Sequence, residues 1–130
     1  IQIEARVLGD LAFNHVIPVT TRYQNALLDK VLKIKSVFSQ EESERMSLRD
    51  LEQIKTMEEH MIIIKDKVDE MVEARKIANR ITSEREKAIA YHDNVCPLLE
   101  DIRYHIDKLE LMVDDEMWPL PKYRELLFIR

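Results

Sequence analysis

Histidine, cysteine and carboxylate side chains carry most metal and nucleophile chemistry, and glycine-rich loops bind phosphate groups. The sequence holds four histidines, one cysteine and one glycine. With Gly9 alone, the chain has no glycine-rich phosphate loop of the Walker or dinucleotide type. The single Cys96 excludes a zinc site built from cysteine pairs. His-Glu-x-x-His and Gly-x-Ser-x-Gly motifs are also missing.

A metal centre inside a helical bundle uses a different pattern, Glu-x-x-His on facing helices. The residues three positions before the four histidines are Ala12, Met57, Ile89 and Ile102. None of them is a glutamate, so this pattern is absent too. We therefore expect no catalytic, cofactor-binding or metal-binding residue in the chain.

Two smaller sets of polar residues could still support chemistry. Asp101 and His105 lie four residues apart, which places them on one helix face. They form either half of a metal or acid–base site or an ordinary surface pair worth a few tenths of a kcal/mol, and the second reading is favoured. Glu58, Glu59 and His60 are most simply a solvated face.

Two further residues stand beside prolines. His15 precedes Pro18, where it can bond backbone carbonyls that the proline leaves free. Cys96 precedes Pro97 near the expected start of a helix, a position that can lower a thiol pKa. Because no histidine follows it at a useful distance, we expect Cys96 to be a small core residue.

The composition favours long helices in one all-α domain over residues 1–130. Hydrophobic residues make up 45% and charged residues 35%, with one glycine and four prolines, too few for many tight turns. A net charge of −5 argues against nucleic-acid binding. No apolar run approaches the roughly 20 residues that span a membrane. The lone cysteine fits a reducing compartment, and we expect a cytoplasmic location.

The first helical region is expected over residues 1–38. Pro18 interrupts it, which predicts one helix ending near residues 15–17 and a second beginning at Pro18, or else a single kinked helix. Its second half carries an apolar face at helical spacing: Leu27, Val31, Ile34 and Phe38. Residues 39–46 are polar and are expected to form a loop.

A second long helix is expected from Ser47, with Asp50 completing an approximate capping box, to about His92. Its apolar stripe is Ile54, Met57, Met61, Ile64, Val68 and Met71, in which the methionines fill core gaps. Ser83 and Glu86 could cap a new helix, but continuity is favoured because no glycine or proline intervenes.

The third helix has the clearest pattern. Its apolar residues alternate steps of four and three: Val95, Leu99, Ile102, Ile106, Leu109 and Val113. Asn94 is its expected N-cap, with Pro97 in its first turn. A short turn at Asp93 and Asn94 would make the preceding helix its antiparallel neighbour. The chain is thus expected to form an antiparallel bundle of three long helices.

The C-terminal residues contain a proline-rich turn, Trp118-Pro119-Leu120-Pro121, and a short final helix is expected after it. We expect Trp118 to pack against the bundle. The acidic residues 114–116 crowd a helix C-terminus, where the helix dipole disfavours them. Lys122 or Arg124 is expected to pair with them.

Charge is uneven along the chain. Residues 75–87 hold five basic and two acidic residues, a local charge of +3. Residues 100–116 hold seven acidic and two basic residues, a local charge of −5. Such runs are usually solvated faces, but these two could also meet across a subunit boundary.

The apolar helical pattern is already present at Ile1, with no N-cap residue and no initiator Met before it. We therefore expect a C-terminal piece of a larger protein, and the alternative is a free-standing helical-bundle or coiled-coil interaction module.

Several segments resemble one family, the bacterial type III glutamine synthetases. Near the N-terminus they are residues 1–12 (IQIEARVLGDLA), 14–18 (NHVIP) and 22–25 (RYQN). Near the C-terminus they are residues 102–110 (IRYHIDKLE) and 113–128 (VDDEMWPLPKYRELLF). The first group is similar to the region after the family's catalytic domain, and the second to its extreme C-terminus.

The resemblance implies a parent enzyme that joins ammonia to glutamate with ATP and Mg²⁺, assembled as stacked hexameric rings. The family's metal-binding, glutamate-binding and nucleotide-binding residues lie upstream, and none matches a position here. The chain would then be a structural and assembly domain. Its partners would be the catalytic domain of the same chain and neighbouring subunits of a homo-oligomer.

Overall fold

The computed structural model describes residues 2–113, and every element in that range is helical, which confirms the all-α prediction. The elements are α1 (Gln2–Leu11), the π-helical turn η1 (Ala12–Val16), α2 (Ile17–Val37), α3 (Gln40–Asn79), α4 (Glu84–Ala90), the π-helical turn η2 (Tyr91–Val95) and α5 (Cys96–Met112). The predicted short C-terminal helix, the packing of Trp118 and the pairing of the acidic residues 114–116 lie outside the described residues.

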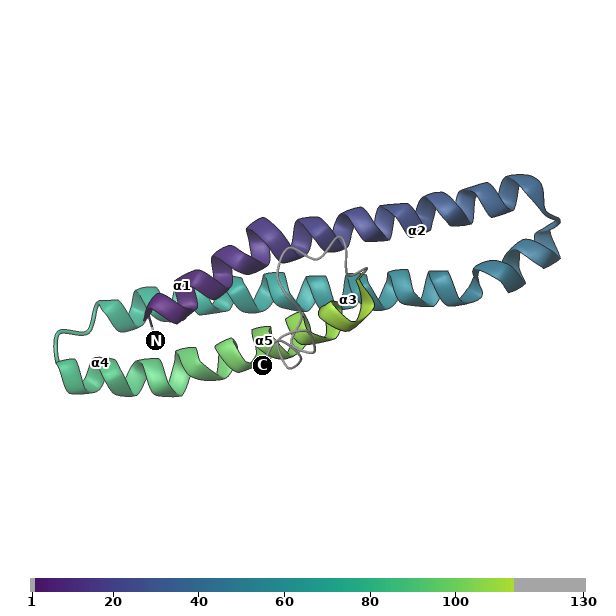
Figure 1. Ribbon diagram of the computed structural model, residues 1–130. Helices are drawn as coiled ribbons and strands as arrows, with labels where there is room; N and C mark the ends of the chain where they lie inside the picture. The colour runs from purple at the N-terminus through teal and green to yellow at the C-terminus, as the bar shows by residue number, and fades with distance from the viewer. Residues whose placement is uncertain (1, 114–130) are drawn as a thin grey trace, which may run out of the picture.

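The described chain doubles back twice, so that α3 lies between two other helical runs (Figure 1). Residues 38–39 connect α2 to α3, and residues 80–83 connect α3 to α4. Helix α2 lies along one side of α3, and α5 lies along another. The far ends of α2 and α3 form a hairpin that extends beyond the end of α5 (Figure 1).

Both described prolines follow a π-helical turn. The Ile17 N–H donates to the Ala12 carbonyl and the Cys96 N–H to the Tyr91 carbonyl, each five residues back. Pro18 and Pro97 then occupy the first turns of α2 and α5. A proline has no N–H to contribute, and the wider turn before it absorbs the missing hydrogen bond while the chain stays helical.

The helix therefore does not break at Pro18, and the prediction of two separate helices there was wrong. Val16 and Ile17, just before the proline, both have right-handed helical backbone angles. A kink in the helix axis at Pro18 stays a prediction.

The expected loop at residues 39–46 was also wrong, because α3 begins at Gln40. Ser39 is its N-cap: its Oγ accepts the Glu42 N–H at 3.3 Å and donates to the Glu42 carboxylate at 2.9 Å. This serine cap fixes the helix start eight residues before the predicted cap, Ser47. Ser47 lies inside α3, fully buried.

The second connection likewise lies away from its predicted place. Helix α3 ends at Asn79, and Ser83 caps α4 by accepting the Glu86 N–H at 3.4 Å. The predicted continuous helix to His92, with a turn at Asp93 and Asn94, was therefore wrong. Those two residues belong to the π-helical turn η2, and Asn94 caps no helix.

The core follows the predicted apolar stripes of α3 and α5, whereas of the predicted face on α2 only Val31 is buried and Phe38 is 42% exposed. The α5 seam is confirmed, since all six of its residues are buried: Val95, Leu99, Ile102, Ile106, Leu109 and Val113. The α3 stripe from Met57 to Met71 is also buried, whereas Ile54 is half-buried. Ala5, Ala12 and Val16 of the first helical run belong to the same cluster. No helix within residues 2–113 has the length and apolar character to cross a membrane.

Replacing the α3 cap tests the revised helix start. Ser39→Ala removes the acceptor of the Glu42 N–H, and we expect it to lower the free energy of unfolding by about 1 kcal/mol. Thermal and urea denaturation of the chain would measure the change. The control is Ser36→Ala in the last turn of α2, where we expect less than about 0.5 kcal/mol. Equal effects of the two substitutions would contradict the assignment of Ser39 as the cap.

Candidate functional site

Three polar residues of α3 lie along one edge at intervals of seven, and each contacts α5. We call this set of contacts the α3–α5 polar edge. Gln53 donates to the Met112 carbonyl at 3.2 Å, His60 Nδ1 lies 2.8 Å from His105 Nδ1, and Lys67 Nζ lies 3.8 Å from the Asp101 carboxylate. Residue numbers fall along α5 as they rise along α3. The contacts therefore fix the register between the two helices.

The two histidines at the centre of this edge form a direct imidazole–imidazole contact. Their ring centroids are 5.1 Å apart and their planes are tilted by 50°. The Tyr104 ring meets His105 edge-on, also with centroids 5.1 Å apart. In a hydrogen bond between two ring nitrogens, one donates and the other accepts, so at least one imidazole must be neutral.

The surroundings favour the neutral imidazoles. Partial burial lowers the pKa of His60 below its ordinary value of 6.5; Glu59 opposes this shift and Lys108 reinforces it. The pKa of His105 is lowered by burial first, then by His60, with Asp101 opposing and Lys67 reinforcing the shift. Both histidines are therefore mainly uncharged at neutral pH.

This pair was not predicted, and the predicted readings need correction. Asp101 forms its ion pair with Lys67 rather than with His105. His60, expected on a solvated face, is half-buried against His105. The usable signal was the seven-residue spacing of Gln53, His60 and Lys67, which marks one edge of a helix. The partner helix and its register do not follow from that spacing.

The other singled-out residues make few contacts. The His15 side chain is exposed and makes no hydrogen bond within the described residues, so the expected bond to carbonyls near Pro18 is not formed there. Cys96 is a free, half-buried thiol rather than a fully buried core residue. Within residues 2–113, no group of three or more histidine, cysteine, aspartate or glutamate side chains is placed to hold a metal ion.

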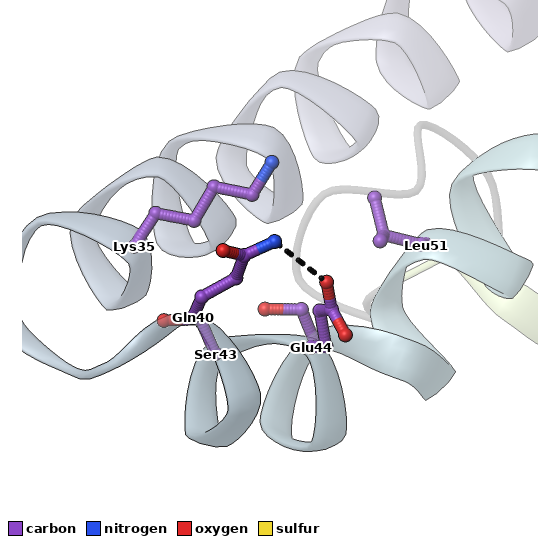
Figure 2. Close-up of a pocket in the computed structure, with 6 residues that line it drawn as sticks. Lys35, Gln40, Ser43, Glu44 and Leu51 are labelled. Atoms are coloured by element: carbon purple, nitrogen blue, oxygen red, sulfur yellow. Dashed lines mark hydrogen bonds between the residues drawn. The ribbon is translucent and has the colours of Figure 1, made fainter.

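A hollow of ≈ 400 Å³ lies between α2 and α3 near the end of their hairpin (Figure 2). Its lining residues are Lys35 from α2 and Gln40, Ser43, Glu44, Ser47 and Leu51 from α3. Gln40 donates to the Glu44 carboxylate at 3.3 Å, as Figure 2 shows. Lys35, on the opposite wall, forms no ion pair within the part of the chain that the structure describes.

The two serines that line this hollow differ in their hydrogen bonding. The Ser43 hydroxyl is 3.3 Å from the Ile34 carbonyl and 3.4 Å from the Phe38 carbonyl, and it can donate to either of them. Ser47 is 1% exposed, yet its hydroxyl has no hydrogen-bond partner among residues 2–113. A buried hydroxyl without a partner destabilises the fold.

Two exposed leucines lie on the same side of α2 as Lys35. Leu32 and Leu28 precede Lys35 by about one and two helical turns, so they share its side of α2. Leu32 is 64% exposed, and Leu51 on α3 is 42% exposed. We call Leu28, Leu32, Lys35 and Leu51 the hairpin face. It is an apolar surface with one cation that has no partner among the described residues.

Removing the partnerless hydroxyl tests this description of the hollow. We expect Ser47→Ala to leave the free energy of unfolding unchanged or to raise it by up to ~1 kcal/mol, because it removes a buried hydroxyl without a bond to any described residue. The matched substitution Ser43→Ala, which deletes a bonded hydroxyl, should lower it by about 0.5–1.5 kcal/mol. Denaturation of both variants measures the difference, and a larger loss for Ser47→Ala would contradict it.

Comparison with known proteins gives consistent similarities. A family model described as the glutamine synthetase C-terminal domain matches residues 1–35. Over all 130 residues, the chain is 53% identical to a glutamine synthetase of Bacteroides fragilis. It is 27% identical over the same length to a type-3 glutamine synthetase of Dictyostelium discoideum. The chain spans 18% of the length of each of these relatives.

Proposed function

We infer that this chain is the C-terminal helical domain of a type III glutamine synthetase, with a structural and assembly role in that enzyme. The observation that carries the inference is 53% identity along the whole chain to a glutamine synthetase. The chain spans 18% of that relative's length, so most of the enzyme lies outside it. The resemblance at both ends of the sequence supports the same reading.

The parent enzyme would join ammonia to glutamate with ATP and Mg²⁺. Its catalytic residues would lie in the larger remainder of the protein, where the family carries them. ATP and Mg²⁺ would bind there too, so we assign this domain no cofactor. Its contribution would be to hold neighbouring parts of the enzyme in position.

The folded unit that does this would be one antiparallel bundle of three long helices. The register along the α3–α5 polar edge supports it, since Gln53 meets Met112 and Lys67 meets Asp101. The contacts between α2 and α3 run in the same antiparallel order. Lys30 pairs with Asp50 at 3.0 Å, and the Thr21 hydroxyl meets the Met61 sulfur at 3.7 Å. Polar contacts at several points would keep the helices from sliding past one another.

The hairpin face is the surface we assign to contact with the rest of the enzyme, either the catalytic domain of the same chain or a neighbouring subunit. When a partner covers an exposed leucine such as Leu32, apolar surface is removed from water, and this burial stabilises the contact between the two surfaces. Lys35 offers a charge for an acidic group of that partner. The partnerless Ser47 hydroxyl lies beside it in the hollow.

The second candidate is a free-standing helical interaction module. It is disfavoured because the similarity to glutamine synthetases runs through all 130 residues, with no part left over for another protein family. A cytoplasmic location follows from the proposed function and stays a prediction.

The division of labour within the enzyme can be tested by activity. We expect the purified 130-residue chain neither to hydrolyse ATP nor to form glutamine, while the intact enzyme does both. Phosphate release and glutamine formation in the presence of Mg²⁺ are the measurements, with a heat-treated sample as background. Mg²⁺-dependent phosphate release by the chain above that background would show that it carries a catalytic site.

The assembly role can be tested on the hairpin face. In the intact enzyme, Leu32→Asp places a charge on the proposed interface, and we expect the dissociation constant of the assembly to rise about tenfold or more. The control Leu111→Asp changes an equally exposed leucine of α5, where we expect no change. Light scattering after gel filtration over a dilution series gives the particle mass. Unchanged assembly in the Leu32→Asp variant would remove the hairpin face from the interface.

A further inference from the structure

The contact between His60 and His105 joins α5 to α3 at the middle of the α3–α5 polar edge. We propose that this pair is a pH-sensitive contact that holds α5 against α3. The contact is formed while at least one imidazole is neutral and is broken when both are protonated. The proposal concerns the packing of these two helices. It therefore goes beyond the proposed function and does not rest on it.

The geometry permits only one proton between the two facing nitrogens. The Nδ1 atoms are 2.8 Å apart, a hydrogen-bonding distance, and one of them must offer a lone pair. When both rings are protonated, each Nδ1 carries a hydrogen and each ring a positive charge. The hydrogen bond is then lost and two like charges face one another across the helix interface.

The neighbouring charges do not compensate for a second proton. The charged groups that act on the pair within the described residues come from the two helices themselves: Glu59 and Lys67 on α3, Asp101 and Lys108 on α5. Each helix thus supplies one acidic and one basic group, and together they are neutral. Asp101, the acid that acts on His105, is also within ion-pair distance of Lys67 at 3.8 Å.

The direction of the pH effect follows from the lowered pKa values of both histidines. The folded protein binds these protons less readily than the unfolded chain does. The stabilisation is therefore fully present above the ordinary histidine pKa of 6.5 and is lost as the pH falls below it. The pair responds in the range where histidine alone among unperturbed side chains changes charge.

The position of the pair decides which segment responds. The connection at residues 80–83 ties α4 to α3, whereas the end of α5 lies far from that connection (Figure 1). Beyond His105, Gln53 donates across the polar edge to the Met112 carbonyl, in the last turn of α5. Opening of the pair should therefore loosen residues 102–112 before the rest of the bundle.

Amide hydrogen exchange in the intact protein tests this inference directly. We expect exchange in residues 102–112, corrected for its intrinsic pH dependence, to be about three- to tenfold faster at about pH 5.5 than at about pH 7.5. His60→Gln and His105→Gln each leave at most one imidazole, so two facing imidazolium ions cannot form. In both variants the pH-dependent increase should disappear.

The control is His92→Gln, which removes an imidazole whose side chain is 82% exposed and which faces no other histidine. This variant should keep the wild-type pH response. Because the readout is the ratio between two pH values within one variant, a uniform loss of stability does not imitate the effect. Wild-type exchange that is independent of pH, or an unchanged ratio in both glutamine variants, would overturn the proposal.

Discussion

The burial of one stripe of α3 between two helical runs is the constraint on which the other features depend. Met57, Ile64 and Met71 are each at most 1% exposed. Burying such a side chain contributes about 1.5–3 kcal/mol before the entropy of ordering is subtracted. A helix of 40 residues with this much apolar surface on one side is stable only when partners cover it. The two connections place those partners on α3.

The apolar faces could be predicted from the sequence, and the helix ends could not. Steps of three and four residues mark the buried side wherever a helix lies, so the α5 seam was predicted in full. The ends depend on capping, which is local. Ser39 with Glu42 and Ser83 with Glu86 carry the capping signals. The polar composition of residues 39–46 instead favours a loop, and the absence of glycine and proline near Ser83 favours a continuous helix. Asp93 and Asn94 favour a turn by residue type, but they lie in η2, which keeps the chain helical.

The candidate site was harder to predict for a physical reason. The contact between His60 and His105 depends on how far α5 is shifted along α3, and that shift depends on the length of the connection at residues 80–83. A prediction that placed the connection at residues 93–94 could not bring these two histidines together. The sequence spacing instead pairs Asp101 with His105, which share one helix. Pairs within one helix are visible in the sequence, whereas pairs between helices require the register.

The π-helical turns before Pro18 and Pro97 have a consequence for how this domain can change in evolution. A π-helical turn holds one more residue than the α-helical turn it replaces. Elsewhere in these helices, inserting or deleting one residue would rotate every following side chain by about 100° and turn the core stripe toward water. Within residues 12–16 or 91–95, a single deletion can instead convert the wide turn into an ordinary one. These two short segments are the places where the helical runs can vary in length.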